Sequence, residues 1–175
     1  HFSVTPDITA LGKAFGGGFP IAAVCGRKDI MARFDYVNEP LETVAFCGAS
    51  LYGHPVGAVA SLATIAELEK PGVYERLYKT GADLRRGLVD LLCHYNHLPA
   101  QVMGTGPTWH IVFSPHEVVD YRTSMLEDAN LKRKFYSGIY EKGIHILGRG
   151  YISLAHNHED VEKTLDACDY SFRKM

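Results

Sequence analysis

The sequence lacks the marks of several large protein classes. Its 175 residues contain no apolar run that approaches the roughly 20 residues of a membrane span, and no signal peptide is visible at its start. Lysine and arginine number 18 against 20 aspartate and glutamate residues, which leaves a formal net charge of -2. This balance gives no electrostatic reason to expect nucleic acid or an anionic membrane as a partner. We therefore expect neither.

The cysteines are too scattered to indicate a cross-linked scaffold or a metal centre. No Cys-x-x-Cys spacing occurs, and disulfide frameworks belong mainly to small secreted domains. We therefore predict reduced thiols in a cytoplasmic protein. The nine histidines show no ligand spacing with a neighbouring thiol or carboxylate, so no metal site is predicted. The four cysteines are Cys25, Cys47, Cys93 and Cys168.

What is present is an ordinary globular composition, with 46% hydrophobic and 22% charged residues, and one unusual segment. There Lys13 stands between an apolar turn and three glycines, Gly16, Gly17 and Gly18. A lysine amine is nucleophilic only when neutral, and desolvation lowers the lysine pKa from its free value of about 10.4. Schiff-base chemistry with pyridoxal phosphate needs such a lysine, and glycines allow close approach to a bulky ligand. Taken singly, a lysine is usually a solvated surface charge, and that alternative stays open here.

Apolar periodicity and turn residues divide the rest of the chain into elements. Helices are expected over residues 27–34, 54–70, 73–95, 126–142 and from Asn157 onward, where Asn157 and Asp160 resemble a capping box. Strands are expected over residues 19–26, 100–103, 109–113, 144–147 and 151–155, the last two as a pair around Gly148-Arg149-Gly150. Pro71-Gly72 interrupts the helical pattern, so we expect a domain transition near residues 71–79.

Five blocks of sequence carry a family resemblance. They read TPDITALGK followed by GGGFPIAA at residues 5–23, GR at 26–27, GASLYGHP at 48–55, PGVYERL at 71–77 and YISLAH at 151–156. Their wording and order resemble the class III pyridoxal-phosphate-dependent aminotransferases. Within that family they are most similar to glutamate-1-semialdehyde 2,1-aminomutase and its aminotransferase relatives.

The resemblance implies a fold and a place within a longer chain. The fold is that of the type I pyridoxal-phosphate-dependent transferases, as in aspartate aminotransferase, with a mainly parallel sheet in a large α/β domain. Residues 1–75 would be the end of that large cofactor-binding domain, and residues 76–175 the small C-terminal α+β domain. Because the family's other cofactor-binding groups precede the lysine, we expect this chain to be the C-terminal part of a larger polypeptide and to be inactive by itself.

The resemblance also implies roles for three residues. Lys13 corresponds to the lysine that forms the Schiff base with pyridoxal phosphate and then moves a proton. Ser50 stands where the family usually has a threonine that contacts the cofactor phosphate of the neighbouring subunit, which implies a homodimer; a loop serine that caps the next turn is the alternative. Arg149 corresponds to an arginine that binds a substrate carboxylate, and an exposed turn arginine is the alternative. His54-Pro55 replaces the family's common Asn-Pro, and we expect it to begin a helix.

The expected function is transfer of an amino group from a small-molecule donor to a carbonyl acceptor. The first alternative is the aminomutase reaction of tetrapyrrole synthesis, in which the amino group returns to the same carbon skeleton. Gly148 replaces a glutamate of that enzyme, which argues against it. The second alternative is a non-catalytic homologue that acts in assembly, against which the intact surroundings of Lys13 argue. A nucleotide-binding module is not predicted, because the glycines match neither Gly-x-Gly-x-x-Gly nor a P-loop.

Overall fold

The computed structural model describes residues 2–46, 48 and 50–175, and it divides into two compact units. Unit 1 is His1–Lys70 and unit 2 is Pro71–Met175, so the division falls a few residues before the boundary predicted at residue 75. The assignment of these units to a large and a small domain stays a prediction. Within the described part of the chain, no helix is both long enough and apolar enough to span a membrane.

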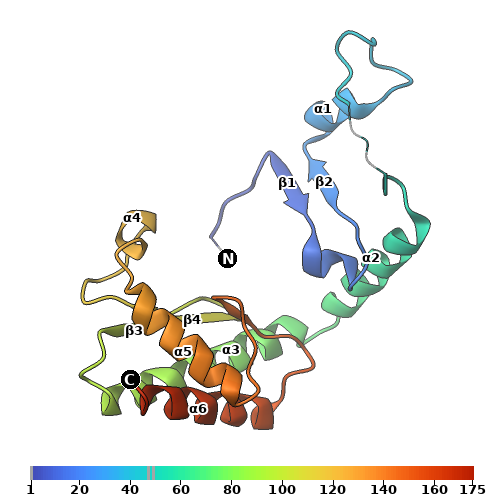
Figure 1. Ribbon diagram of the computed structural model, residues 1–175. Helices are drawn as coiled ribbons and strands as arrows, with labels where there is room; N and C mark the ends of the chain where they lie inside the picture. The colour runs from blue at the N-terminus through green and yellow to red at the C-terminus, as the bar shows by residue number, and fades with distance from the viewer. Residues whose placement is uncertain (1, 47, 49) are drawn as a thin grey trace. The chain divides into compact units, whose positions relative to one another are not determined.

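Unit 1 is built around an antiparallel strand pair whose connection contains Lys13 (Figure 1). The register joins Ile8 to Gly26 and Leu11 to Ala23. The elements of unit 1 are β1 (Ile8–Leu11), the 3-10 helix η1 (Lys13–Gly16), β2 (Ala23–Gly26), α1 (Lys28–Met31), η2 (Ala32–Phe34) and α2 (Pro55–Leu68). The predicted helices at residues 27–34 and 54–70 are confirmed, the first as α1 followed by η2.

The strand predicted over residues 19–26 is wrong in its first half. Backbone turns occupy that half, because Phe19 N donates to Gly16 O at 2.9 Å and Ile21 N donates to Phe19 O at 3.0 Å. In the strand β2 that follows, Ala23 is half-buried and the other three residues are exposed. Every strand pair among the described residues is antiparallel, so the parallel strands implied for the large domain are not among them.

Arg27 closes the open end of the β1–β2 pair. Its backbone N donates to Asp7 O at 3.0 Å, and its guanidinium forms ion pairs with Asp7 at 2.7 Å and Asp29 at 2.6 Å. The two carboxylates raise the pKa of Arg27, Asp29 more than Asp7. A Cβ on Gly26 would lie 2.5 Å from Asp7 O, so only glycine fits beside that carbonyl. These exposed pairs contribute little to stability, but they fix the strand ends opposite Lys13.

Unit 1 buries few of its own side chains. Among its described residues only Gly16, Gly57 and Ser61 are buried. Helix α2 packs on η1 through small residues, and a Cβ on Gly57 would lie 3.2 Å from Ile21 Cβ. The rest of the apolar surface is exposed. It includes Ile8, Phe19, Val24, Leu51, Tyr52, Val56, Val59 and Leu62. An apolar surface of this kind is typical of a face that another protein segment covers.

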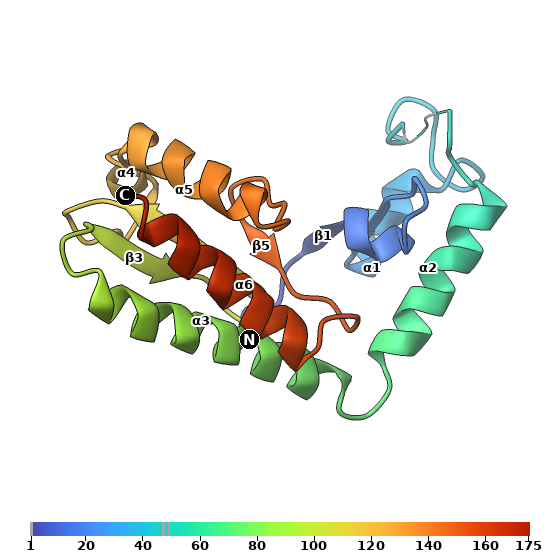
Figure 2. The ribbon, with the colours of Figure 1, turned by 60° about the horizontal axis from the view of Figure 1, so that its bottom comes forward.

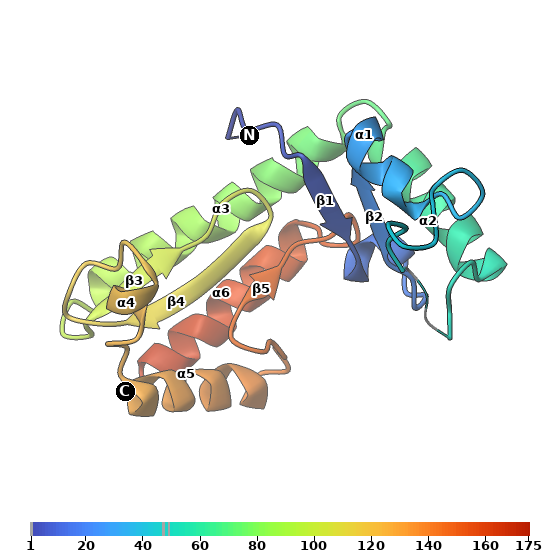
Figure 3. The same ribbon diagram turned by 90° about the horizontal axis from the view of Figure 1, so that it is seen from above.

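Unit 2 is a two-layer α+β structure with a closed core. Its sheet has the order β3-β4-β5, all antiparallel. Helix α6 packs between α3 and α5, and those two flanking helices contact the sheet (Figures 2 and 3). The elements are α3 (Val73–His94), β3 (Ala100–Met103), β4 (Thr108–Phe113), α4 (Tyr121–Ser124), α5 (Ala129–Glu141), β5 (Gly150–Tyr151) and α6 (His158–Phe172).

Aromatic rings from three elements form the centre of that core. Phe135 of α5 stacks on Phe172 of α6 with ring centroids 5.2 Å apart, and Phe113 of β4 lies 5.6 Å from Phe135. None of the three is more than 1% exposed. Burial of each such side chain contributes about 1.5–3 kcal/mol, so unit 2 has the apolar core that unit 1 lacks.

Local signals placed most elements of unit 2 correctly. The predicted strands at residues 100–103 and 109–113 and the predicted helices at residues 73–95 and 126–142 are confirmed as β3, β4, α3 and α5. The capping box before α6 is confirmed, because Asp160 N donates to the Asn157 side chain and Asn157 N donates to the Asp160 carboxylate. Helix α4 was not predicted.

The strand pair predicted for residues 144–147 and 151–155 is wrong. Strand β5 pairs with β4, with Trp109 opposite Gly150 and Thr108 opposite Tyr151. Helix α5 ends in a tight turn at Gly143, whose φ is 79°, and Ile144 N donates back to Ile139 O at 3.0 Å. Residues 144–147, which follow this turn, form no strand. The residues after Arg149 pair with β4 instead.

Candidate active site

Lys13 occupies a backbone conformation that is rare for its residue type. Its φ is 54°, and Ser3 is the other non-glycine residue with a positive φ among the described residues. A side-chain-bearing residue in this left-handed region costs about 1–3 kcal/mol and persists only where its surroundings enforce it. Such outliers cluster at functional sites. The Lys13 side chain is exposed, so its amine is free to meet a ligand.

The glycines after Lys13 have two different uses. A Cβ on Gly16 would lie 2.8 Å from Ile21 Cγ2, and a Cβ on Gly17, whose φ is 56°, would lie 2.6 Å from Thr64 Oγ1 of α2. These two glycines therefore let the turn close against its own chain. Gly18 has a φ of 97° and open space around its Cα. Of the three, only Gly18 leaves room for a bulky neighbour, and the expectation that they lie beside the cofactor stays a prediction.

Ser50 is exposed in the segment before α2. The N-cap of α2 is His54, whose Nδ1 accepts from Gly57 N at 3.3 Å, so the prediction that His54-Pro55 begins a helix is confirmed. Ser50 therefore does not cap α2. Cys47 and Ala49, which belong to the same sequence block, lie outside the described residues. An apolar hollow of about 680 Å³ lies along this segment and β2, lined by Pro20, Ile21, Ala22, Ala23, Val24, Met31, Phe34, Gly48, Leu51 and Tyr52.

Arg149 is exposed in a turn of unit 2 that is held on both sides. On one side, Tyr136 Oη of α5 donates to Gly148 O at 2.7 Å, and Gly148 has a φ of 80°. On the other side, buried Gly150 lies so close to the Trp109 indole that a Cβ at this position would overlap it. The turn is therefore fixed while the arginine between the glycines stays accessible.

Tyr136 and His110 are two neighbours of Arg149 that the sequence did not reveal. Burial raises the pKa of Tyr136 from its ordinary value to about 12. Like an ordinary tyrosine hydroxyl, it is protonated at neutral pH, and it donates to Gly148 O. The β4–β5 register, extended by one residue, sets His110 opposite Arg149. Burial and then the charge of Arg149 lower the pKa of His110. No sequence pattern links these positions, because the strand and helix that carry them meet only in the fold.

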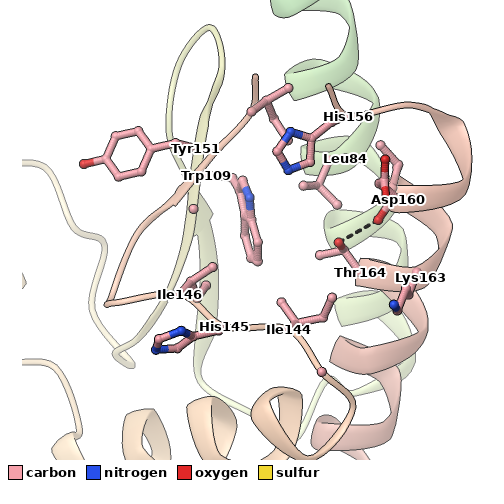
Figure 4. Close-up of a pocket in the computed structure, with 14 residues that line it drawn as sticks. Leu84, Trp109, Ile144, His145, Ile146, Tyr151, His156, Asp160, Lys163 and Thr164 are labelled. Carbon is pink, nitrogen blue, oxygen red and sulfur yellow. Dashed lines mark hydrogen bonds between the residues drawn. The ribbon is translucent and has the colours of Figure 1, made fainter. Parts of the chain in front are cut away.

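A second hollow lies beside the Arg149 turn but does not include it. It has a volume of about 270 Å³, and Trp109 stands in the middle of its lining residues (Figure 4). Thr164 and Asp160 line it from α6, and Thr164 Oγ1 donates to Asp160 O at 2.7 Å. Trp109 and Gly150 therefore line this hollow and also restrain the Arg149 turn.

The predicted site residues are distributed over both units. Lys13 and Ser50 belong to unit 1, and Arg149 belongs to unit 2. Within the described ranges, no three His, Cys, Asp or Glu residues are grouped so that they could hold a metal ion. The exposed amine of Lys13, in its enforced turn beside Gly18, fits a covalently held aldehyde cofactor better than a metal or a nucleotide.

Comparison with known proteins gives consistent matches along the whole chain. The sequence profile of Aminotransferase class-III matches residues 1–165. Glutamate-1-semialdehyde 2,1-aminomutase of Thermodesulfovibrio yellowstonii is 35% identical over 179 residues, which cover 100% of this chain and 40% of that protein. The chain thus spans about 40% of the length of this relative.

Two solved structures share the fold. An omega-transaminase from Sphaerobacter thermophilus has a TM-score of 0.87 and 32% identity, covering 97% of this chain and 39% of that one. A structure described as a transaminase with PLP bound has a TM-score of 0.81 and 26% identity, covering 98% and 39%. These likenesses confirm the predicted fold type.

We expect His110 to titrate below the ordinary histidine pKa of about 6.5. Its imidazole is half-buried, and Nδ1 has no hydrogen-bond partner among the described residues. Because the folded state disfavours the charged ring, stability is highest above the unfolded pKa and falls as the pH drops below it. An NMR titration of the His110 ring protons measures this shift. A midpoint at or above the ordinary histidine value of about 6.5 would contradict the prediction.

Proposed function

Because this chain belongs to the class III aminotransferase family, we propose that it carries the cofactor lysine of a pyridoxal-phosphate-dependent enzyme that transfers amino groups. The amino donor and the carbonyl acceptor are small molecules. The observation that carries the proposal is the turn at Lys13. A lysine with a φ of 54° stands in an enforced turn, within the sequence block that resembles the family's cofactor lysine.

Pyridoxal phosphate, when bound, supplies an aldehyde carbon and an electron sink for the substrate carbon that loses a proton. Lys13 would hold the cofactor through its Nζ. When that Nζ is not bonded to the cofactor, its neutral amine would act as the general base and acid that moves a proton from the substrate carbon. The rigid turn keeps this amine in position for that proton transfer.

The exposure of Lys13 sets a condition on this chemistry. An amine surrounded by water is protonated at neutral pH and cannot act as a nucleophile or a base. Unit 1 leaves Lys13 exposed, so the neutral amine depends on whatever covers this turn in the active enzyme. Bound cofactor and substrate would provide that cover from the side of Gly18, where the structure has open space.

Ser50 is our candidate for a contact to the cofactor phosphate across a subunit interface. Its hydroxyl can donate to a phosphate oxygen as the threonine of the family does, and it is exposed. This role requires a homodimer, and the exposed apolar surface of unit 1 suits such an assembly. A cytoplasmic location agrees with the described cysteines, Cys25, Cys93 and Cys168, which are free thiols.

Arg149 is our candidate for the substrate carboxylate. An arginine presents parallel N–H donors that pair with both oxygens of a carboxylate. Arg149 is exposed between two restrained glycines, so its guanidinium is available without a mobile backbone beneath it. This role predicts amino acids as substrates in preference to simple amines.

The aminomutase reaction is the second candidate. A relative with 35% identity is named for it, which supports this alternative. Gly148 stands where the resemblance to that enzyme would require a glutamate, which favours transfer between two molecules. A non-catalytic homologue is the third candidate, and the enforced turn at Lys13 argues against it because backbone outliers of this kind cluster at functional sites.

A half-reaction separates the three candidates. The holoenzyme, mixed with an amino acid and no acceptor, should lose its visible cofactor absorbance and release one equivalent of keto acid. Lys13→Ala should abolish this turnover, whereas Lys28→Ala, at an exposed lysine nearby, should not. Absorbance and mass spectrometry of the product measure both effects.

Two other results would contradict amino transfer between molecules. Conversion of a semialdehyde into an isomer, with no keto acid released, would indicate the aminomutase reaction. A purified full-length protein with no visible cofactor absorbance, even after incubation with pyridoxal phosphate, would indicate the non-catalytic homologue.

Ser50→Ala should weaken cofactor binding. Loss of a hydrogen bond to a charged group costs about 1.5–3 kcal/mol, which is roughly a 10- to 150-fold rise in the Kd for pyridoxal phosphate. Ser50→Thr keeps the hydroxyl and should bind nearly as well as the parent. Titration of the apoenzyme, followed by cofactor fluorescence, gives both constants. An unchanged Kd in the alanine variant would remove Ser50 from the phosphate site.

A further inference from the structure

We propose that Tyr136 is a positioning residue that holds the Arg149 turn in the conformation that binds a substrate carboxylate. The inference rests on the proposed function, because it gives a role to the surroundings of a residue whose own role is proposed there. Tyr136 lies on α5, whereas Arg149 lies in the turn before β5, and we assign Tyr136 no contact with the substrate. The supporting evidence is the geometry of the turn.

The first observation is the direct bond from Tyr136 to the turn. Tyr136 lies on α5, and its hydroxyl donates to Gly148 O at 2.7 Å. Its ring makes an edge contact with buried Phe135, with centroids 5.4 Å apart, so the core fixes where the hydroxyl points. The carbonyl that it holds belongs to the residue directly before Arg149, and the bond therefore restrains the peptide group that leads into the arginine.

The second observation is that the turn is restrained equally closely on its other side. Gly150 packs on the Trp109 indole with no room for a Cβ, and it pairs with Trp109 in the β4–β5 register. Ile152 N then donates to Pro107 O at 2.8 Å. Trp109 itself is buried, and Figure 4 shows its indole among the residues that line the hollow beside the turn.

Arg149 is thus an exposed side chain on a restrained backbone. Its neighbours on both sides are fixed, one by Tyr136 and one by Trp109, while the arginine itself is exposed. An arginine on a fixed backbone loses less conformational freedom when it binds a carboxylate, because only its own rotamers must be ordered. Without the Tyr136 hydroxyl, the Gly148 peptide is free to rotate, and glycine places few limits on that rotation.

The alternative is that Tyr136 only stabilises unit 2. Tyr95→Phe is the matched control, because Tyr95 Oη donates to Asp169 Oδ1 at 2.6 Å in the same unit and far along the chain from Arg149. Both tyrosine variants remove one hydroxyl. Tyr136→Phe loses the bond to Gly148 O, and Tyr95→Phe loses the bond to Asp169 and a second one that Tyr95 Oη accepts from Arg173 Nε at 3.3 Å. Only Tyr136→Phe should change the Arg149 turn.

The first readout does not depend on activity. Trypsin cleaves after Arg149 only when the turn loosens enough to enter the protease, and peptide mass spectrometry reports the cleavage rate at each site. In the holoenzyme, Tyr136→Phe should speed cleavage after Arg149 several-fold relative to cleavage after exposed Lys142. Tyr95→Phe should leave that ratio unchanged. An unchanged ratio in Tyr136→Phe would overturn the proposal.

The second readout is a substrate comparison. Tyr136→Phe should raise the KM for an amino acid about 3- to 10-fold, the usual range for one lost hydrogen bond, with little change in kcat. The KM for an amine that lacks the carboxylate should stay the same. If Arg149→Ala raises the KM for the amino acid and Tyr136→Phe does not, the positioning role is wrong. If Arg149→Ala leaves that KM unchanged, the proposed role of Arg149 has failed, and the role of Tyr136 fails with it.

Discussion

The left-handed backbone at Lys13 is the constraint around which unit 1 is arranged. A φ of 54° costs about 1–3 kcal/mol, and the surrounding contacts must supply that energy. The β1–β2 ladder holds the two ends of the connection, and the backbone bond from Arg27 N to Asp7 O extends the pairing at the far end. Gly17 closes the turn against Thr64 of α2. With these contacts in place, the Lys13 side chain is exposed.

The two units present their candidate residues by different means. Unit 2 has a closed aromatic core, and α5 and β4 extend from that core to hold both glycines beside Arg149. Unit 1 has almost no core, and its lysine turn is fixed by backbone pairing and by glycines that permit close approach. The exposed apolar surface of unit 1 fits an assembly in which further protein covers it. In such an assembly, the low-polarity surroundings of Lys13 would come from the protein that covers unit 1.

Sequence reasoning succeeded where the determinants are local. Helix α6 followed from Asn157, Asp160 and its apolar stripe, because caps and helical periodicity lie within a few residues of one another. Lys13 stood out through its immediate neighbours. The pairing of β5 with β4 and the bond from Tyr136 to Gly148 were missed, because both join segments that are distant in sequence. The φ of Lys13 was also out of reach, because no residue type near it requires that conformation.

The central claim is that Lys13 is the residue that holds the cofactor covalently. Borohydride reduction of the holoenzyme fixes the cofactor to its lysine, and proteolysis with mass spectrometry then locates the added pyridoxyl group. We predict that the group is found on the peptide that contains Lys13 and is lost from that position in Lys13→Arg. A pyridoxyl group on Lys28 or Lys70 instead would contradict the account.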